Sequence, residues 1–273
     1  MSLPKITVII ATYNKTDWLE KVLHGYGIQT YKDFEIIIAD DGSTNETKEL
    51  IVKFKANYPV DIIHVWHEDA GYRRQKILNE AIMKAKNEYI LFTDGDCIPR
   101  EDFVETHAIH AESGYFLSGG YCKLPMGISE SITENDIKSK RCFELNWLKK
   151  QGQLSRKNKL KLSAKNGFAN VLDLFTPTGA TFNNCNSSAW KSDLIAINGY
   201  DERMQYGGPD RELGERLINN GIKTKQIRYK AICLHLDHAR GYKTQESLDR
   251  NLAIRAKVKK EKLKWTSHGI KKD

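Results

Sequence analysis

The first 120 residues alternate between short runs of apolar, mostly β-branched residues and longer amphipathic stretches, and this alternation restricts the fold more than any other feature. The short runs predict strands at residues 7–13, 35–40, 61–67 and 89–93. The amphipathic stretches predict helices, one capped by Asp17 and two more at residues 46–57 and 72–86. Strands that alternate with helices form βαβ units, so we expect an α/β fold with a mostly parallel, twisted sheet and helices on both faces.

The second half of the chain has weaker patterns. Residues 116–123 and 227–236 each predict one more strand, and residues 210–220 predict a helix that ends at Gly221. The segment 126–175 is polar and rich in lysine, which is consistent either with helices or with a mobile flap that closes over a ligand. The chain shows no internal repeat and no flexible linker, so we expect one domain with subregions.

Basic residues are concentrated in two segments. The 273-residue chain has a net charge of +8, with seven Lys/Arg and no acid over residues 149–165, and eight Lys/Arg against two acids over residues 251–273. A basic segment of this kind binds nucleic acid or anionic lipid, or is simply a solvated face, which is the commonest outcome. Because Leu252 and Trp265 lie among the C-terminal lysines, we keep peripheral contact of that tail with an anionic membrane as a minority hypothesis.

The apolar runs and the cysteines indicate an intracellular setting. No apolar run approaches the roughly 20 residues of a membrane span, and MSLPKITVII has no small-residue cleavage site, so it predicts a strand rather than a signal peptide. The five cysteines are odd in number and none is spaced C-x-x-C, which predicts reduced, mostly buried thiols. We therefore expect a cytoplasmic location.

Acidic side chains follow two of the predicted strands. Ligands of open parallel sheets bind at the carboxyl ends of strands, where Asp40-Asp41 and Asp94-Gly95-Asp96 lie. Two carboxylates this close repel each other unless a cation lies between them, and oxygen ligands suit Mg²⁺ or Mn²⁺, which would also bind a diphosphate. The alternative for both motifs is a turn, since Asp, Gly and Ser favour turns.

Three further motifs supply the other groups that such a site needs. Arg74, in the motif GYRRQ at a predicted helix start, would bind phosphate oxygens, although an exposed arginine pair is the simpler interpretation. In YGGPDRE, Gly207 and Gly208 let the backbone approach a ligand, and Asp210 at the helix start would be a general base or only a helix cap. His235 or His238 would complete a metal site begun by Asp96, or be structural.

Together these motifs resemble the family 2 glycosyltransferases of the GT-A fold. The motifs that carry the resemblance are TVIIATYN, ADDGST, GYRRQKILNEAI, YILFTDGDC, NGYDERMQYGGPDRELGERL and AICLHLDH. The second half also resembles the acceptor domain of galactosyltransferases and chondroitin polymerases. The resemblance covers most of the chain, with residues 126–175 the least assignable part. It implies a donor subregion at 1–120, an acceptor and catalytic-base subregion at 121–245, and a basic helix or tail at 246–273.

The resemblance also implies a reaction. The enzyme would be an inverting, metal-dependent glycosyltransferase that moves a sugar from a nucleotide diphosphate donor, with uridine the expected nucleoside, to a glycan hydroxyl in surface polysaccharide biosynthesis. Manganese or magnesium would be the cofactor, and nucleic acid would not be a partner.

Specific roles follow from the same resemblance. The donor would contact Thr12, Tyr13, Asp40 or Asp41, Tyr72, Arg74 and Asp94. Asp96 and His235 would bind the metal, Asp210 would be the general base, and Tyr206 would offer an aromatic face to the acceptor, beside Gly207 and Gly208. Similar enzymes usually read Gly-Gly-Glu-Asp where this chain has Gly-Gly-Pro-Asp, and this difference affects the identity of the acceptor more than the chemistry.

Two other functions compete with transfer. A sugar-nucleotide nucleotidyltransferase would also use an α/β sheet and a metal, but its expected glycine-rich N-terminal loop is missing, since residues 11–14 read ATYN. A non-catalytic module that binds sugar or nucleic acid would use the basic segments, but it gives no reason for Asp94, Asp96 and Asp210 to occur together.

Overall fold

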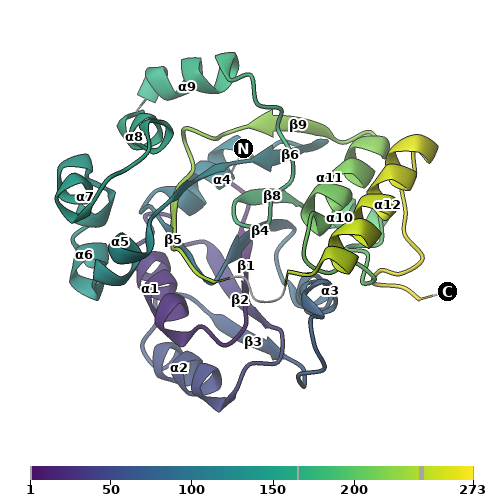
Figure 1. Ribbon diagram of the computed structural model, residues 1–273, viewed down its shortest axis with the longest axis horizontal. Helices are drawn as coiled ribbons and strands as arrows, with labels where there is room; N and C mark the ends of the chain where they lie inside the picture. Colours follow the sequence, from purple (N-terminus) through teal and green to yellow (C-terminus); the bar gives the residue numbers. More distant parts are fainter. Residues whose placement is uncertain (1, 165, 240–242, 273) are drawn as a thin grey trace.

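The computed structural model describes residues 2–164, 166–239 and 243–272 and shows a central sheet covered by helices (Figure 1). The first half follows the predicted alternation closely. Its elements are β1 (Ile6–Thr12), α1 (Thr16–Gly27), β2 (Phe34–Asp40), α2 (Asn45–Lys55), β3 (Ile62–Trp66), α3 (Arg74–Lys84) and β4 (Tyr89–Asp94). The helix cap is the exception: α1 has Lys15 at its N-cap and Asp17 lies inside its first turn, so Asp17 does not cap it.

The main sheet has seven strands in the order β3-β2-β1-β4-β8-β6-β9. The first four are parallel to one another, and β8 (Ser187–Trp190) is antiparallel to both β4 and β6 (Tyr115–Ser118). The edge strand β9 (Lys223–Gln226) pairs parallel with β6. A second sheet of three short strands holds β5 (Cys97–Pro99), β10 (Ile232–His235) and β7 (Gly120–Lys123).

Two predicted strands differ from expectation: one is divided and the other is shorter. The single strand expected at 116–123 is divided at Gly119 between the two sheets. A Cβ at Gly119 would lie only 2.1 Å from Asn186 Oδ1, and the Gly119 N–H donates to the Asn186 carbonyl (2.9 Å). The strand expected at 227–236 begins only at Ile232, because Ile227 accepts a turn bond from Ala231 N (3.0 Å).

The segment 126–175 is helical. Its elements are α5 (Met126–Ser131), α6 (Glu134–Lys138), the 3₁₀ helix η1 (Arg141–Phe143), α7 (Leu145–Gln151), α8 (Arg156–Ser163) and α9 (Asn166–Phe175). In α6 the capping residue Thr133 and Asp136 exchange backbone-to-side-chain hydrogen bonds, which satisfies amides that the first turn leaves unpaired. Helices, rather than an unstructured flap, therefore form this part of the molecule.

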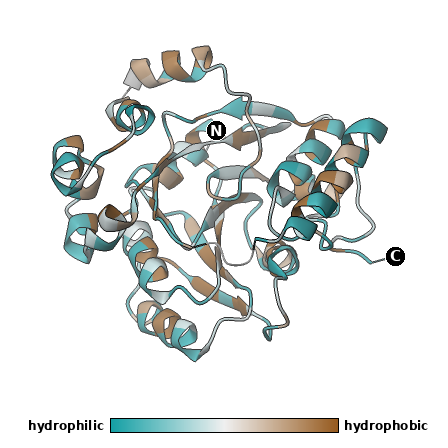
Figure 2. Cartoon of the chain, in the orientation of Figure 1, coloured by the Kyte–Doolittle hydropathy of each residue, from teal (hydrophilic) through white to brown (hydrophobic). Residues whose placement is uncertain are grey.

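Apolar side chains are buried on both faces of the main sheet. Along β1, Val8 and Ile10 face one cluster while Ile9 and Ala11 face the other, as the two-residue repeat of a strand requires. The hydropathy colouring shows the same apolar strands at the centre of the fold (Figure 2). One face is covered by α1, α2 and α4 (Phe103–His110), and the other by α3, α10 (Lys191–Ala196) and α11 (Pro209–Asn219). The predicted α/β fold with helices on both faces is confirmed.

The C-terminal region packs against the domain instead of extending from it as a tail. Helix α11 ends as predicted, with Gly221 in the left-handed region (φ +93°) and Ile222 N donating to Leu217 O (3.0 Å). Helix α12 (Gln245–Glu261) lies along α11, and Arg255 pairs with Glu215 (2.6 Å). Across the described residues, no helix has both the length and the apolar character that crossing a bilayer requires.

Candidate active site

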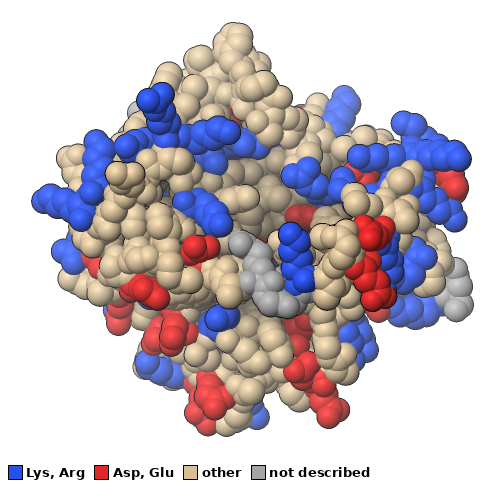
Figure 3. All heavy atoms as spheres, in the orientation of Figure 1, with Lys and Arg blue, Asp and Glu red and all other residues tan. Residues whose placement is uncertain are grey.

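A cavity of about 1590 Å³ opens at the carboxyl ends of the parallel strands. Its walls come from β1, β4, β7, α8, the start of α11 and the segment after β10, so residues from both halves of the chain meet there. Figure 3 shows lysine and arginine side chains around the recessed centre of the molecule. All five cysteines are buried and free, and Cys185 also lines this cavity.

The parallel register explains why distant residues share one wall. Thr12 lies opposite Asp40 across β1 and β2, and Ala11 lies opposite Asp94 across β1 and β4. The turns that follow are joined in the same way, because Asp41 N donates to Thr12 O (3.1 Å) and Gly95 N donates to Ala11 O (2.8 Å). The parallel strands therefore end at one edge of the sheet and present their polar residues together.

The two adjacent aspartates after β2 differ in position. Asp40 is fully buried, accepts from Ser43 N (2.9 Å), bonds to His64 (2.8 Å) and does not line the cavity. Asp41 lines it, bonds to His67 (2.8 Å) and accepts from Arg73 N (3.1 Å). Burial raises the pKa of Asp41 despite these partners. Of this pair, the structure brings only Asp41 to the cavity.

The other predicted donor residues lie around Asp41. Thr12, Tyr13 and Tyr72 line the cavity, and Tyr13 donates its hydroxyl to Asp69 (2.9 Å). Arg74, in the first turn of α3, forms an ion pair with Asp94 at the end of β4. Burial raises the pKa of Asp94, and the charge of Arg74 opposes that shift. Arg74 is therefore held beside a carboxylate instead of being an exposed arginine.

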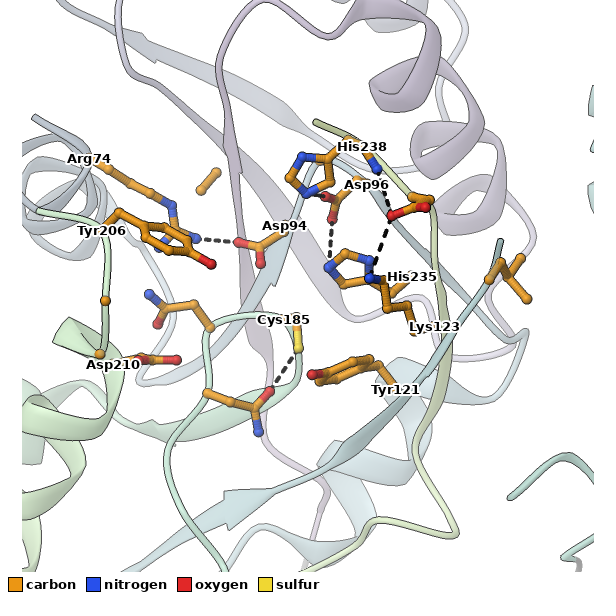
Figure 4. A pocket seen from close by; sticks show the side chains of 18 of the residues that line it. Arg74, Asp94, Asp96, Tyr121, Lys123, Cys185, Tyr206, Asp210, His235 and His238 are labelled. Carbon is orange, nitrogen blue, oxygen red and sulfur yellow. Dashed lines mark hydrogen bonds and ion pairs between the residues drawn. The ribbon is translucent and has the colours of Figure 1, made fainter. Parts of the chain in front are cut away.

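Asp96 faces two histidines from the other half of the chain (Figure 4). Its carboxylate lies 3.0 Å from His238 Nε2 and 3.9 Å from His235 Nε2. The Nδ1 atom of His235 bonds to the carbonyl of Leu236 (2.9 Å), and that of His238 bonds to the carbonyl of Ala239 (2.8 Å). A carbonyl only accepts, so Nδ1 of each ring carries a hydrogen, and Nε2 is the ring nitrogen that faces Asp96.

This arrangement suits a bound cation. One ligand atom from each of Asp96, His235 and His238 lies within 4.8 Å of the other two, and a backbone partner on the second ring nitrogen is the usual support of a metal-binding histidine. Burial alone would raise the pKa of Asp96, but its hydrogen bond to His238 and the nearby His235 lower that pKa overall. Cys97 Sγ donates to Asp96 Oδ1 (3.3 Å) and so orients the carboxylate.

Asp210 reaches the same cavity from the opposite side. It lies in the first turn of α11, behind Pro209 at the helix start, and it accepts from Arg211 N (2.8 Å). Figure 4 shows its carboxylate directed into the space that Asp94 also faces. The three aspartates 94, 96 and 210 therefore converge on one cavity.

The loop before α11 has a shape that only glycine allows. Gly207 (φ +115°) and Gly208 (φ +89°) both adopt left-handed backbone, and a Cβ on Gly207 would lie 2.5 Å from Leu248 Cδ2 of α12. Asn251 of α12 donates to the carbonyls of this loop, at 3.0 Å to Gln205, 3.1 Å to Tyr206 and 3.2 Å to Gly207. Helix α12 therefore supports the wall formed by Tyr206 and Gly207.

Several cavity residues were not predicted from the sequence. Asn183, Asn184 and Cys185 form a wall before β8, and Tyr200 donates its hydroxyl to Asn184. The lysine-rich segment was the one available signal for Lys157 and Lys161 of α8, which also line the cavity. Asn183 and Asn184 could not be predicted because they lie in a loop, and loops have no periodic pattern of apolar residues.

Comparison with known proteins finds two family models that match the sequence. A sequence model of the family described as glycosyl transferase family 2 matches residues 7–157, and one described as the N-terminal domain of galactosyltransferase matches residues 172–239. The chain is 26% identical to the Bacillus subtilis glycosyltransferase YfnE, over 91% of this chain and 69% of that protein. It is also 26% identical to validoxylamine A glucosyltransferase of Streptomyces hygroscopicus subsp. jinggangensis, over 80% of this chain and 52% of that protein.

Solved structures share the fold at low sequence identity. A Pyrobaculum calidifontis mannosyltransferase in complex with GDP-Man and Mn²⁺ has a TM-score of 0.59 at 18% identity, over 89% of this chain and 59% of that one. Staphylococcus aureus TarS (1–349) with UDP-GlcNAc has a TM-score of 0.61 at 14% identity, over 94% of this chain and 69% of that one. Because the family match covers more than half of the sequence, the chain belongs to glycosyl transferase family 2 and is a glycosyltransferase with the GT-A fold.

Proposed function

We propose that this chain is an inverting, metal-dependent enzyme that moves a sugar from a uridine diphosphate donor to a hydroxyl of a glycan acceptor. The observation that carries the proposal is the convergence of Asp94, Asp96 and Asp210 on one cavity. Uridine is supported by the similarity to TarS, whose structures contain UDP and UDP-GlcNAc. Surface polysaccharide biosynthesis is proposed as the setting, from the resemblance of the second half to polymerase acceptor domains.

The donor would bind along the edge formed by β1, β2 and β4. We assign the base and ribose to Thr12, Tyr13 and Asp41, which line that end of the cavity. Arg74 and Tyr72 would contact the phosphates or the nucleotide, with Asp94 holding the guanidinium and contacting the ribose. Residues 1–120 therefore provide most of the donor subsite, and residues 121–245 most of the acceptor subsite.

Asp96, His235 and His238 would hold the divalent ion. A carboxylate with two neutral imidazoles suits manganese better than magnesium, because magnesium prefers oxygen ligands alone. When bound, the ion neutralises the charge that develops on the departing diphosphate. The ligands come from both halves of the chain, so the proposed metal centre joins the two subsites.

Asp210 would be the general base. Its carboxylate accepts the proton of the acceptor hydroxyl while that oxygen bonds to the anomeric carbon, and the bond from that carbon to the diphosphate oxygen breaks. A single displacement from the face opposite the leaving group inverts the anomeric configuration. Tyr206 would stack on the acceptor sugar, and the backbone of Gly207 and Gly208 would lie close to it.

Two substitutions separate the proposed roles. Asp96→Ala should remove the manganese-dependent rise in melting temperature that a nucleotide diphosphate sugar produces, because a ligand stabilises only through its affinity for the folded state. Asp210→Asn should retain that rise and lower transfer by about 10²- to 10⁴-fold, the usual contribution of a general base. The exposed Asp33 lies outside the cavity, so Asp33→Asn is the matched control.

The assay is sugar transfer with the anomeric configuration of the product read by NMR. Full activity of Asp210→Asn would refute the base assignment, and retention of configuration would refute the single displacement. Release of pyrophosphate from a nucleoside triphosphate would instead favour a nucleotidyltransferase.

A further inference from the structure

Helix α9 exposes a row of large apolar side chains at the edge of the molecule. The exposed fractions are 53% for Phe168, 49% for Val171, 78% for Leu174 and 75% for Phe175, and we call these four residues the α9 ridge. In Figure 1 the helix lies outermost, and Figure 2 shows that much of it is apolar. Scattered exposed apolar residues are normal, but four within one short helix form a patch of the kind that marks an interaction site.

The orientation of α9 is set by its inner face. Ala169 and Asp173, four residues apart, are buried at 3% and 7% exposure. The Asp173 carboxylate accepts from Tyr229 N (3.0 Å) and pairs with Lys230 (3.4 Å). These contacts attach the polar side of the helix to the domain, so the α9 ridge must face outward.

The two helices that precede α9 in the chain carry exposed positive charges. Helices α7 and α8 precede α9 directly and expose Lys149, Lys150, Arg156 and Lys157. The sequence has no acid between residues 149 and 165, and within the described part of the chain none of these four cations has a carboxylate partner. Figure 3 shows lysine and arginine side chains next to an uncharged projection at the edge of the molecule.

We propose that the α9 ridge, with these four cations, docks on the surface of a membrane that contains anionic lipids. The apolar side chains would enter the boundary between headgroups and acyl chains, while the cations contact lipid phosphates. A projecting ridge needs no complementary groove in a fluid surface. A second copy of the chain is disfavoured, because a two-fold contact through this face would bring the two sets of unpaired cations together.

Docking in this way has a consequence for the cavity. Helix α8 follows the exposed Lys149 and Lys150 and contributes Lys157 and Lys161 to the cavity wall. A membrane bound through α9 would therefore lie next to that wall. The C-terminal helix, where the sequence suggested membrane contact, buries Ser247, Asn251 and Val258, and contact of its exposed side with a membrane stays a prediction.

The experiment is flotation of the full-length chain with vesicles of phosphatidylcholine, alone or with one quarter phosphatidylglycerol. The double variant L174S/F175S should lower partitioning onto the anionic vesicles by about a hundredfold, since burying each of the two large apolar side chains is worth at least about tenfold. The double variant K149Q/K150Q should lower it by roughly fivefold per lysine, and neutral vesicles should bind less protein. The changed side chains are exposed, so melting temperatures should match the wild type.

Leu252→Ser is the matched control, because Leu252 is 59% exposed among the basic residues of α12 and should leave flotation unchanged. The proposal is overturned if the wild type does not float with anionic vesicles, or if L174S/F175S floats as well as the wild type. It is equally overturned if Leu252→Ser abolishes flotation, which would assign binding to α12. Light scattering that shows a wild-type dimer and a monomeric L174S/F175S would assign the ridge to a second copy. None of these results depends on transfer activity.

Discussion

His107 is a buried histidine whose protonation should destabilise the fold in mild acid. It lies in α4 with no exposed surface, its Nδ1 is 2.7 Å from Ser188 Oγ, and its Nε2 is 2.9 Å from Asn186 Oδ1. The amide oxygen only accepts, so Nε2 carries the hydrogen and Nδ1 accepts from Ser188. Ser188 in turn bonds to Tyr89 (2.9 Å), and Asn186 Nδ2 donates to the carbonyl of Gly120 (2.7 Å). Every partner therefore suits a neutral ring.

The size of the effect follows from the pKa of His107. Burial lowers this pKa to about 3, whereas the unfolded chain has the ordinary value of about 6.5. Between these values the unfolded state binds a proton that the folded state does not, so the free energy of unfolding falls as the pH falls below 6.5. At pH 5 the loss from this one group is about 2 kcal/mol.

The assay is urea unfolding of the wild type and of His107→Gln at pH 7 and pH 5. Other groups also titrate in this range, including His110, whose pKa burial lowers to about 4, so the difference between the two proteins isolates His107. We expect the wild type to lose about 2 kcal/mol more than the variant between the two pH values. Equal losses would refute the burial of a neutral ring, and the exposed His268→Gln should behave as the wild type.

Two further substitutions remove contacts that hold α11 and the loop before it in place. Arg216 is fully buried and donates two hydrogen bonds to Glu212 (2.6 and 2.8 Å). Arg216→Ala leaves this buried carboxylate unpaired, so the free energy of unfolding, measured with denaturant, should fall by about 3–5 kcal/mol. A smaller loss in the double variant with Glu212→Ala is required if the pairing is the cause. Asn251→Ala removes the three hydrogen bonds to the carbonyls of residues 205–207. The variant should have a raised KM for the acceptor and an unchanged KM for the donor. An equal rise in both KM values would show a general loss of structure.

The first half of the fold was predictable because its signals are local and repeated. The strand expected at residues 89–93 is β4 (Tyr89–Asp94), and the helix expected at 72–86 is α3 (Arg74–Lys84). A strand buried on both faces must be apolar throughout, and this pattern can be recognised without knowing its neighbours. The polar residues that end such strands could therefore be assigned to one edge of the sheet.

The second half was less predictable because its strands depend on contacts between distant residues. Strand β8 reads Ser-Ser-Ala-Trp and β9 reads Lys-Thr-Lys-Gln, and neither has an apolar pattern. They exist because β4 and β6 offer them unpaired backbone edges. Likewise, nothing near Gly119 in the sequence indicates that Asn186 would fill the space beside it and divide the expected strand.

The same dependence on distant contacts explains why the sequence did not show how the basic C-terminal helix packs. The number of charged residues indicates that one side of this helix is exposed, but it does not indicate what the other side packs against. Asn251 on that buried side supports the loop before α11, and Thr266 donates to Asp201 (2.8 Å) further along the same segment. Since α11 carries Asp210, the position of the proposed base depends on residues that follow it by more than forty positions. Removing the segment from Asn251 onward to test for membrane contact would therefore also disturb the wall formed by Tyr206 and Gly207. Leu252→Ser, in contrast, changes only the exposed side of α12.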